Sequence, residues 1–328
     1  MRFTPKSGSL IPMGKSFWNN LKKPFFCLAP MADVTDSAFL RIIAKYGKPS
    51  VMWTEMVSCD GLVSDGKKKL LRSLIYSEKE RPIVAQVFGS KPENFYKTAK
   101  LIKKLGFDGI DINMGCPDRK INKQGAGAAL IKTPELAKEI IRQTKLGAGG
   151  LPVSVKTRIG FLKNEIKEWL PHLLEAKPVA ISIHGRTRKE MSKVPTHWDA
   201  IAEAVKMAKG SGVLIIGNGD VKSMDEARMR AEESGVDGVM IGRGIFGNPW
   251  FFGEKKKEAL SLREILKVML EHAKLFEKIY KGGRSFLLMR KHFASYICGF
   301  PGAKDLRIKL MAANSAKDTE KILKPFLA

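Results

Sequence analysis

Strand-like and helix-like segments alternate along this 328-residue chain from about residue 24 to residue 250. Several of the strand-like segments are short, apolar and rich in β-branched residues, which is typical of parallel strands covered on both faces. Eight of them can be placed, at 25–29, 51–56, 83–88, 109–113, 153–157, 179–184, 213–217 and 238–241. Eight alternating units predict a closed (β/α)8 barrel, the TIM barrel of the α/β class.

Helical patterns lie between several of these strands. Three of them are each followed closely by a glycine, a common stop signal, and cover 93–105, 198–208 and 224–234. Another begins at Thr133 and Pro134, residue types that are typical of the first positions of a helix. An open doubly wound sheet is disfavoured, because it would carry a glycine-rich phosphate loop after its first strand, where 29–32 reads Ala-Pro-Met-Ala.

The sequence pattern changes after residue 252, beyond which no further segment has the pattern of a strand. Amphipathic helical patterns continue instead, over 261–281, 286–297 and 306–323. We therefore predict a barrel domain at 1–253 and an all-α helical domain at 254–328. The second of these holds 17 Lys plus Arg against 8 Asp plus Glu.

Charge and cysteine usage limit the class of protein. The formal net charge of +25 predicts an anionic partner, either nucleic acid or an anionic membrane surface. No run of 18 apolar residues exists, so no membrane-spanning helix is expected, and the basic N-terminus lacks the apolar stretch of a signal peptide. The four cysteines form no C-x-x-C pair, which disfavours zinc ribbons and redox dithiols and favours a reducing, cytoplasmic setting.

One of the four cysteines stands on a loop at the end of a strand. Gly115, Cys116 and Pro117 follow the alternating segment 109–113, and the proline prevents the strand from continuing. The carboxyl edge of a parallel barrel is where its chemistry lies. Cys116 could be a proton donor, a nucleophile or a small buried apolar residue, and the sequence leaves these readings open.

Other polar residues end neighbouring strands at the same edge. Gln86 and Lys156 lie in apolar strands, where an amide or an ammonium is costly without a partner. His184 ends the sixth strand, at the same rim as Lys156 and Asn113. Glycine-rich turns follow the seventh and eighth strands, where barrels commonly bind phosphate, at 217–220 and 242–244. No Walker A loop, H-E-x-x-H pattern or metal-ligand cluster is present, so no metal is expected.

Together these motifs resemble the dihydrouridine synthase (Dus) family, near its bacterial DusB-like branch. The matching segments span about residues 24–310 and lie at 29–36, 54–56, 86–89, 113–117, 155–158, 184–188, 217–220, 242–244, 289–292 and 299–303. The resemblance implies an FMN-dependent enzyme that reduces uridine in tRNA to 5,6-dihydrouridine with NADPH. Hydride would pass from the flavin to uracil C6, while Cys116 protonates C5.

The resemblance also implies roles for individual positions. Residues expected to hold the isoalloxazine are Pro30, Met31, Ala32, Gln86, Lys156 and His184. Those expected to hold the ribityl phosphate are Asn218, Gly219, Asp220, Gly242 and Arg243. Those expected to contact the RNA substrate are Asn113, Arg186, Arg290, Lys291 and His292. The stretch 189–198 lacks the aromatic–small–glycine character expected after the sixth strand, so the resemblance does not extend to RNA specificity there.

Two other functions remain open. A flavin barrel that acts on a free pyrimidine, as in dihydroorotate dehydrogenases, would share the cofactor but would need no basic helical domain. A barrel that has lost its flavin could bind RNA without catalysis. The sequence does not reveal which uridine would be reduced, and a monomer is expected for an enzyme that grips a large RNA.

Overall fold

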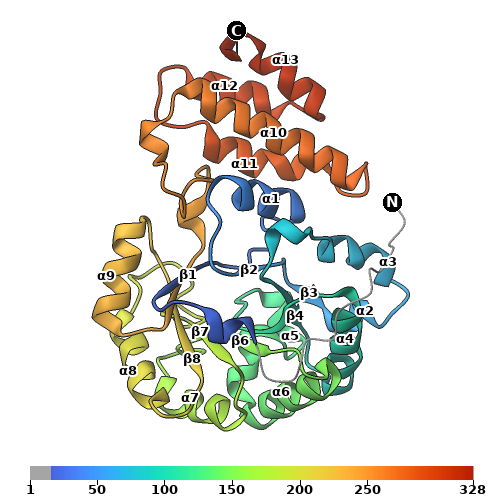
Figure 1. The fold of residues 1–328 in the computed structure, drawn as a ribbon. Helices are drawn as coiled ribbons and strands as arrows, with labels where there is room; N and C mark the ends of the chain where they lie inside the picture. The colour runs from blue at the N-terminus through green and yellow to red at the C-terminus, as the bar shows by residue number, and fades with distance from the viewer. Residues whose placement is uncertain (1–15, 328) are drawn as a thin grey trace.

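The computed structural model describes residues 16–327, so the first part of the basic N-terminal stretch lies outside the described residues. Its strands are all parallel and run in the order β1-β9-β8-β7-β6-β5-β4-β2. A bridge between Cys27 and Val51 joins the two ends and closes the cylinder (Figure 1). The strands are β1 Phe25–Leu28, β2 Met52–Trp53, β3 Val57–Ser58, β4 Ile83–Phe88, β5 Gly109–Met114, β6 Val153–Arg158, β7 Ala180–His184, β8 Leu214–Asn218 and β9 Gly238–Ile241. The predicted (β/α)8 barrel is confirmed.

The strand predicted at 51–56 differs from the structure. Residues 51–56 do not form one strand, because β2 and β3 are separate short strands that both pair with β4. Between them, the Thr54 hydroxyl accepts a hydrogen bond from the Gln86 backbone N–H at 3.1 Å and donates to the Glu55 carbonyl at 2.9 Å. A side chain therefore takes the place of a backbone acceptor, and the strand ladder is interrupted there.

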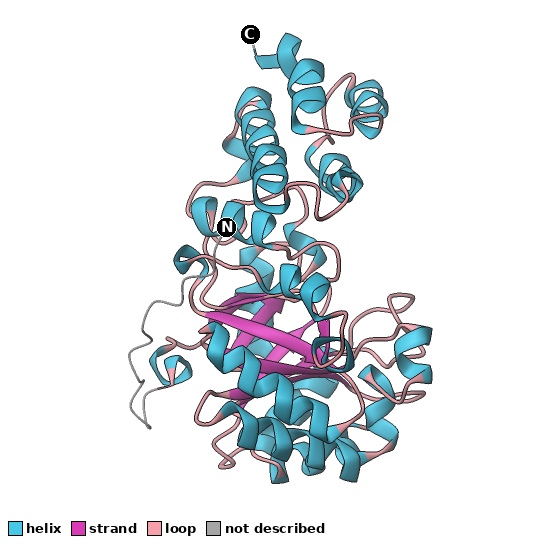
Figure 2. Ribbon diagram, turned by 90° about the vertical axis from the view of Figure 1, so that its right-hand side faces the viewer, coloured by secondary structure: helices cyan, strands magenta, loops and turns pink. Residues whose placement is uncertain are grey.

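Helices surround the cylinder, as Figure 2 shows. The longer ones are α1 Ser37–Tyr46, α4 Pro92–Leu105, α6 Pro134–Ala148, α7 Ile166–Glu175, α8 Trp198–Ala208 and α9 Met224–Ser234, and the short ones are α2 Cys59–Leu62, α3 Lys67–Leu70 and α5 Arg119–Lys123. The predicted bounds of α8 and α9 are confirmed. Thr133 is the N-cap residue of α6 and Pro134 its first residue, as predicted, although the Thr133 side chain makes no capping hydrogen bond.

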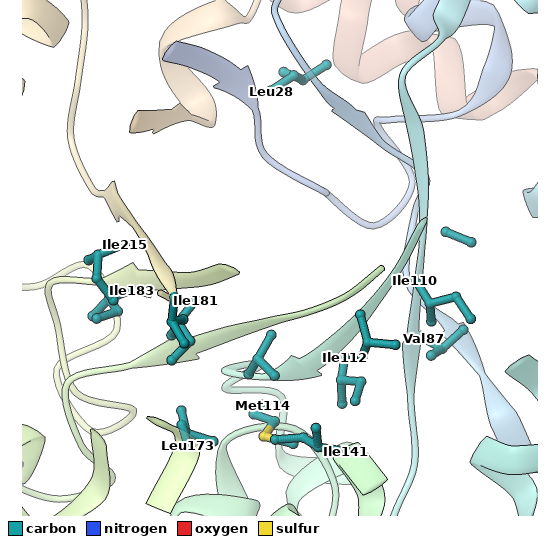
Figure 3. Packing of buried hydrophobic residues seen from close by; sticks show 14 of the residues in the cluster. Leu28, Val87, Ile110, Ile112, Met114, Ile141, Leu173, Ile181, Ile183 and Ile215 are labelled. Carbon is teal, nitrogen blue, oxygen red and sulfur yellow. The ribbon is translucent and has the colours of Figure 1, made fainter. Parts of the chain in front are cut away.

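Strand alternation divides the barrel into an outer and an inner layer of side chains. Ile110, Ile112 and Met114 of β5 belong to the outer cluster, in which Met114 packs near Ile141 of α6 (Figure 3). The inner layer is a separate apolar cluster, which includes Trp18 of the short 3-10 helix Phe17–Asn20. Its ring lies 6.1 Å from both Phe25 and Trp53, so it covers the amino-terminal end of the cylinder.

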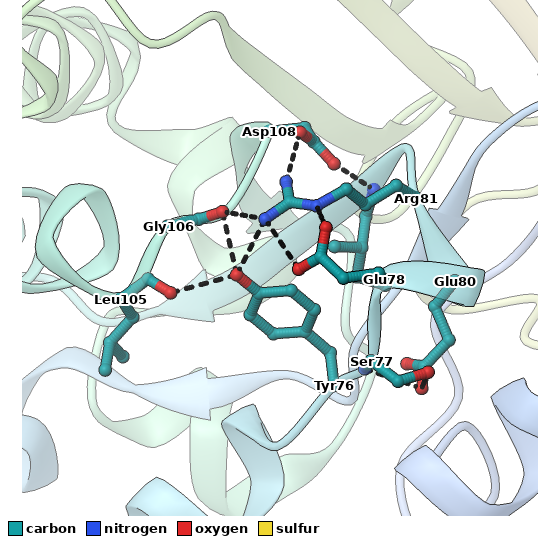
Figure 4. A network of polar contacts seen from close by, with 9 residues as sticks. Tyr76, Ser77, Glu78, Glu80, Arg81, Leu105, Gly106 and Asp108 are labelled. Atoms are coloured by element: carbon teal, nitrogen blue, oxygen red, sulfur yellow. Dashed lines mark hydrogen bonds and ion pairs between the residues drawn. The ribbon is translucent and has the colours of Figure 1, made fainter. Parts of the chain in front are cut away.

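Polar side chains tie the amino-terminal rim on the outside (Figure 4). The Arg81 guanidinium donates to Asp108 at 2.5 Å and to the Gly106 carbonyl at 2.8 Å. The Tyr76 hydroxyl donates to the same carbonyl at 2.8 Å, and Asp108 accepts the Ile83 N–H at 2.8 Å. This network joins the start of β4 to the turn before β5, and it leaves the carboxyl rim as the open end.

Four further helices form a second unit beside α1 (Figure 1). They are α10 Leu262–Tyr280, α11 Met289–Tyr296, α12 Ala303–Met311 and α13 Ala316–Leu327. Their core includes Ala38 and Ile42 of α1 and also Trp250, so barrel residues complete it. The run predicted at 306–323 is two helices, broken between Met311 and Ala316. The division at residue 253 stays a prediction. Among residues 16–327, no helix has the length and apolar character needed to cross a membrane.

Candidate active site

A pocket of about 450 Å³ opens at the carboxyl rim of the barrel. Its lining residues come from the ends of β1, β6, β7, β8 and β9: Ala29, Pro30, Met31, Lys156, His184, Asn218, Gly219, Asp220, Val221, Lys222, Met240, Gly242, Arg243 and Gly244. Nine of the residues predicted to hold a cofactor are among them. Two others lie elsewhere, because Ala32 is exposed on the loop after β1 and Gln86 is buried in the barrel.

The end of the pocket beside β8 and β9 is built from glycine turns and charged side chains. Gly219 has a φ of 143°, and a Cβ there would lie 2.4 Å from Thr196, so only glycine fits. Asp220 forms ion pairs with Arg186 and, at 3.0 Å, with Arg243. Its pKa is lowered mainly by the hydrogen bond from Arg186. The carboxylate thus holds two guanidinium groups at this end of the pocket.

Arg186 itself is directed into the protein. It is 2% exposed, and its Nε donates to the Val194 carbonyl at 2.6 Å while its other nitrogens pair with Asp220. Arg186 therefore links the loop after β7 to the turn after β8 through these hydrogen bonds. Its predicted contact with RNA stays a prediction.

Lys156 of β6 also lines the pocket, beside the end of β8. Its Nζ donates to Asn218 Oδ1 at 3.1 Å, and Asn218 Nδ2 in turn donates to the Met240 carbonyl at 2.7 Å. Burial and the nearby Arg158 lower the pKa of Lys156 to about 8. Asn218 is the one hydrogen-bond partner of this ammonium among residues 16–327, so its remaining hydrogens can be donated to a bound ligand.

His184 lies beside Lys156 among cations. Burial, with the charges of Arg158 and Lys156, lowers the pKa of His184 well below its ordinary value, so the ring is neutral. Its Nδ1 lies 3.5 Å from Arg158 Nη1. A guanidinium can only donate, so this contact favours an Nε2–H tautomer. The ring thus offers a neutral N–H donor to the site.

The cysteine loop is fixed from several sides. Asn113 Oδ1 accepts the backbone N–H groups of Gly115 at 3.1 Å and Cys116 at 2.8 Å, and the Cys116 carbonyl accepts the Ala128 N–H at 3.1 Å. Gly127 packs so closely that a Cβ there would lie 2.9 Å from that carbonyl. Cys116 is half-buried, and burial raises the pKa of its thiol, which therefore stays protonated at neutral pH.

Arg158 connects the cysteine loop to the pocket, a role that the sequence reading did not assign. Its Nε donates to the Gly115 carbonyl at 2.7 Å and its Nη1 to the Thr187 carbonyl at 3.1 Å. The same Nη1 is the atom that lies beside His184. The loop of Cys116 and the ring of His184 are thus held by one guanidinium, so the thiol and the pocket share one rim.

The predicted substrate contacts on α11 lie apart from the pocket lining. Lys291 is exposed, and its Nζ lies 3.5 Å from Asp33 Oδ2 on the loop after β1. His292 is only 5% exposed, with its ring 5.1 Å from Phe39 and 4.5 Å from His272. Burial lowers the pKa of His292 to about 3. The structure places this ring inside the contact between helices, where it positions α11.

An ion pair that the sequence did not single out joins the helical unit to this rim. Arg284 Nη1 lies 2.5 Å from Glu55 Oε2, and its Nη2 lies 3.1 Å from Oε1. Glu55 is 4% exposed, and its Oε1 also accepts the Asp33 N–H at 2.6 Å. The loop after α10 is therefore docked on the carboxyl edge of the barrel.

Within residues 16–327, no group of three or more His, Cys, Asp or Glu side chains could hold a metal ion. Cations, amides, a neutral imidazole and a thiol are gathered at the carboxyl edge of a parallel barrel. This is the edge at which barrel enzymes carry their active sites.

Comparison with known proteins identifies the group within this class. The chain belongs to the dihydrouridine synthase (Dus) family, whose model matches residues 27–328. It is 43% identical over 322 residues to a probable tRNA-dihydrouridine synthase of Staphylococcus aureus (strain COL), covering 96% of this chain and 97% of that protein. It is 42% identical over 319 residues to probable tRNA-dihydrouridine synthase 2 of Bacillus subtilis (strain 168), covering 96% and 97%. The predicted family, and with it an enzyme, is confirmed.

A solved structure is similar in fold. The structure of a 2-naphthoyl-CoA reductase in complex with 2-naphthoyl-CoA aligns with a TM-score of 0.54 and 13% identity, covering 69% of this chain and 49% of that one. This likeness shows the fold alone. The roles of individual residues in this chain therefore have to be argued from its own geometry.

Proposed function

We propose that this enzyme reduces uridine in tRNA to 5,6-dihydrouridine, with FMN as its cofactor and NADPH as its reductant. The observation that carries the proposal is the shared rim: in a chain of the dihydrouridine synthase family, Arg158 links the loop of a protonated Cys116 to a basic pocket. A uridine reductase needs a hydride source and a proton source on the same substrate ring. The pocket and the thiol supply places for these two functions.

The residues of the pocket fit FMN. Its volume of about 450 Å³ lies in the range of cofactor sites. Gly242, Arg243 and Gly244 at one end leave a backbone turn without bulky side chains and with a guanidinium beside it, which suits a phosphate. Lys156 and His184, from β6 and β7, suit the electron-rich carbonyl edge of a flavin. When bound there, FMN would supply the hydride.

Lys156 and Asn218 would orient the cofactor. The Lys156 ammonium is held by Asn218 Oδ1, which limits its rotation and directs its remaining hydrogens toward the pocket. A fixed donor that faces a developing negative charge needs no reorganisation during the reaction, which is the main advantage of such groups over water. Neutral His184 would add a hydrogen bond without further positive charge.

Cys116 would hold the second hydrogen of the reaction. Burial raises the pKa of its thiol, so the proton stays on Sγ until a more basic carbon is formed in the substrate. A nucleophilic cysteine would need a lowered pKa. The raised pKa therefore favours the acid over the nucleophile, two of the three interpretations that the sequence left open. Asn113 would act on this step through the backbone of the loop.

The charge of the helical domain supports the proposal that the reduced uridine is part of an RNA. This domain adds 17 Lys plus Arg against 8 Asp plus Glu to the barrel, and Arg284 docks its first loop on the rim of the pocket. Exposed Lys291 and the neighbouring Arg290 would contact phosphates, while buried His292 would position their helix. We propose a monomer that acts in the cytoplasm, where tRNA is.

The test is reduction of defined RNA by the purified enzyme. Unmodified tRNA, FMN and NADPH should yield uridines heavier by two hydrogens, detected by nucleoside mass spectrometry and mapped to single positions. Uridine monophosphate should give no product. Reduction of the mononucleotide without tRNA would instead support an enzyme of free pyrimidines, and a colourless protein that takes up no FMN yet binds RNA would support a binding module.

A further inference from the structure

Asp111 is a carboxylate inside the barrel to which the proposed function assigns no role. It lies on β5 between Ile110 and Ile112, whose side chains face the helices, so strand alternation turns Asp111 inward. Its side chain is 0% exposed. A buried carboxylate is costly unless hydrogen bonds or charges compensate it, so its contacts show what the barrel gains from it.

Three hydrogen bonds lead from Asp111 to the cysteine loop. Gln86 Nε2 donates to Asp111 Oδ2 at 2.7 Å, and Asn113 Nδ2 donates to Gln86 Oε1 at 3.0 Å. The Cys116 backbone N–H then donates to Asn113 Oδ1 at 2.8 Å. We call this path from Asp111 through Gln86 and Asn113 to Cys116 the amide relay. Ser154 Oγ donates to the other carboxylate oxygen at 2.6 Å and holds Asp111 from behind.

The two ends of the amide relay force the same orientation on both amides. A primary amide can present either its oxygen or its NH2 group in a given direction. An ionised carboxylate only accepts, so Gln86 turns its NH2 group to Asp111 and its oxygen to Asn113. Backbone N–H groups only donate, so Asn113 turns its oxygen to Gly115 and Cys116. Without the carboxylate, only the loop end would remain to orient the amides.

We propose that Asp111 is a positioning residue that aims the Cys116 loop through Gln86 and Asn113. This inference rests on the proposed function only in making Cys116 the proton donor. Among the described residues, the side-chain hydrogen bonds of Asp111 go to Gln86 and Ser154, so its proposed effect on the cysteine loop passes through the two amides. Its charge also acts on Lys156, where it opposes the fall in the pKa of the ammonium. Its loss should loosen the loop while leaving Lys156 and the phosphate end of the pocket in place.

Burial does not neutralise Asp111 at the pH of the cell. Burial raises the pKa of Asp111 to about 6, and the hydrogen bonds from Gln86 and Ser154 together with the charge of Lys156 oppose a larger rise. The group is therefore mostly ionised at neutral pH. The charged, acceptor-only form that the amide relay requires is the form present.

The first test measures the loop directly, without flavin or RNA. Five purified full-length proteins would be alkylated with iodoacetamide: wild type, Asp111→Ala, Asp111→Asn, Asn113→Ala and Asp111→Ala/Asn113→Ala. Mass spectrometry would follow the peptide of Cys116. We expect Asp111→Ala to change the alkylation rate at least threefold. Asp111→Asn, which keeps an oxygen facing Gln86, should lie between it and the wild type. The double variant should match Asn113→Ala, because a serial path is broken only once.

A matched control removes another buried polar group from the barrel. Ser182 is 1% exposed on β7, and its hydroxyl has no hydrogen-bond partner among the described residues. Ser182→Ala should leave the alkylation rate within twofold of the wild type. Equal rates for wild type and both single Asp111 variants would overturn the proposal. If Asp111→Ala does not fold, Asp111→Asn alone decides, and a rate within 20% of the wild type would overturn it.

The second test separates positioning from cofactor binding. In stopped-flow experiments, NADPH should reduce the flavin of Asp111→Asn within twofold of the wild-type rate, whereas tRNA should reoxidise it several-fold more slowly. An equal loss in both half-reactions would overturn the amide relay, because Asp111 would then only shape the cofactor pocket. If the wild type reduces no uridine, the proposed function fails, and the alkylation test still decides the role of Asp111.

Discussion

The charges at the barrel mouth and those on the helical domain are arranged in opposite ways. At the mouth, Lys156, Arg158 and Arg186 each donate to a named acceptor. Burial shifts the pKa of Lys156 and Arg158 downward. On the helical domain, most lysines are exposed. Fixed charges in a low-dielectric site can act strongly on a small ligand, whereas exposed charges act weakly but can serve a long polyanion together.

This difference teaches that the two regions would recognise different features of one substrate. The mouth would recognise the geometry of a ring, so single substitutions there should lower the rate of reduction strongly, and added salt should not have the same effect. The helical domain would recognise phosphates, so single substitutions there should weaken tRNA binding slightly, and added salt should weaken it in the same way.

The largest effect is expected at the thiol of the mouth. Cys116→Ala removes the proposed proton donor while the backbone bonds of the loop remain. The rate of dihydrouridine formation on unmodified tRNA should fall by about 1000-fold, a loss typical of a missing general acid. The absorbance spectrum of the purified variant should show that FMN is still bound. Cys298 is the exposed thiol of the helical domain, and Cys298→Ser serves as the control, with a rate close to the wild type. Near-normal turnover of Cys116→Ala would remove it from the acid role.

A second large effect is expected at Lys156. Lys156→Met removes the fixed donor of the pocket, and the rate should fall by about 100-fold, as for other oriented donors. The pH profile gives an independent check. The lysine is charged below its pKa of about 8 and loses its proton above it, so wild-type turnover should decline as the pH rises through about 8. Activity that is flat up to pH 10 would contradict this role.

An intermediate effect is expected where the two regions meet. Arg284→Ala leaves the Glu55 carboxylate buried without its partner, and breaking a buried pair typically lowers the free energy of unfolding by about 3 kcal/mol. Reduction of the flavin by NADPH should be unchanged, but KM for tRNA should rise, because the helical domain is no longer held to the rim. Arg284→Lys, which keeps one charge, should recover part of both. A KM equal to that of the wild type would show that docking does not depend on this pair.

The smallest effect is expected at a single exposed lysine. Lys291→Ala should weaken tRNA binding only a few-fold and reduce the slope of log Kd against log salt by about one. Lys209 is an exposed lysine at the opposite rim, before β8, and Lys209→Ala should leave both the affinity and the slope unchanged. Equal effects of the two substitutions in a filter-binding assay would show that RNA is not confined to the helical side.

The sequence predicted the barrel well because its signals are local. Strand positions follow from short apolar runs, and the bounds of α8 and α9 follow from helical residue patterns and the glycines shortly after them. The split of the second strand was not predictable, because it depends on the Thr54 hydroxyl bonding the backbone of a neighbouring strand. That bond exists only once the barrel has formed.

A residue type that is out of place in an apolar strand was the useful signal for the candidate site, and Lys156, singled out in this way, lines the pocket. Gln86 carries the same signal but lies inside the barrel, away from the pocket lining. The same signal was available for Asp111, a carboxylate between two isoleucines, but only the closed barrel shows its bonds to Gln86 and Ser154. The pair of Arg284 and Glu55 joins residues far apart in the chain. No spacing rule connects them, so this contact could only come from the structure.

Trp18 closes the amino-terminal end of the cylinder, where it packs on Phe25 and Trp53. A cofactor held at the rim as proposed would then be accessible from one face, and the nicotinamide donor and the RNA base would both have to bind at that face. Their binding would therefore be mutually exclusive. Initial rates at varied concentrations of both should therefore give parallel double-reciprocal lines, the signature of an enzyme that releases one product before it admits the next reactant.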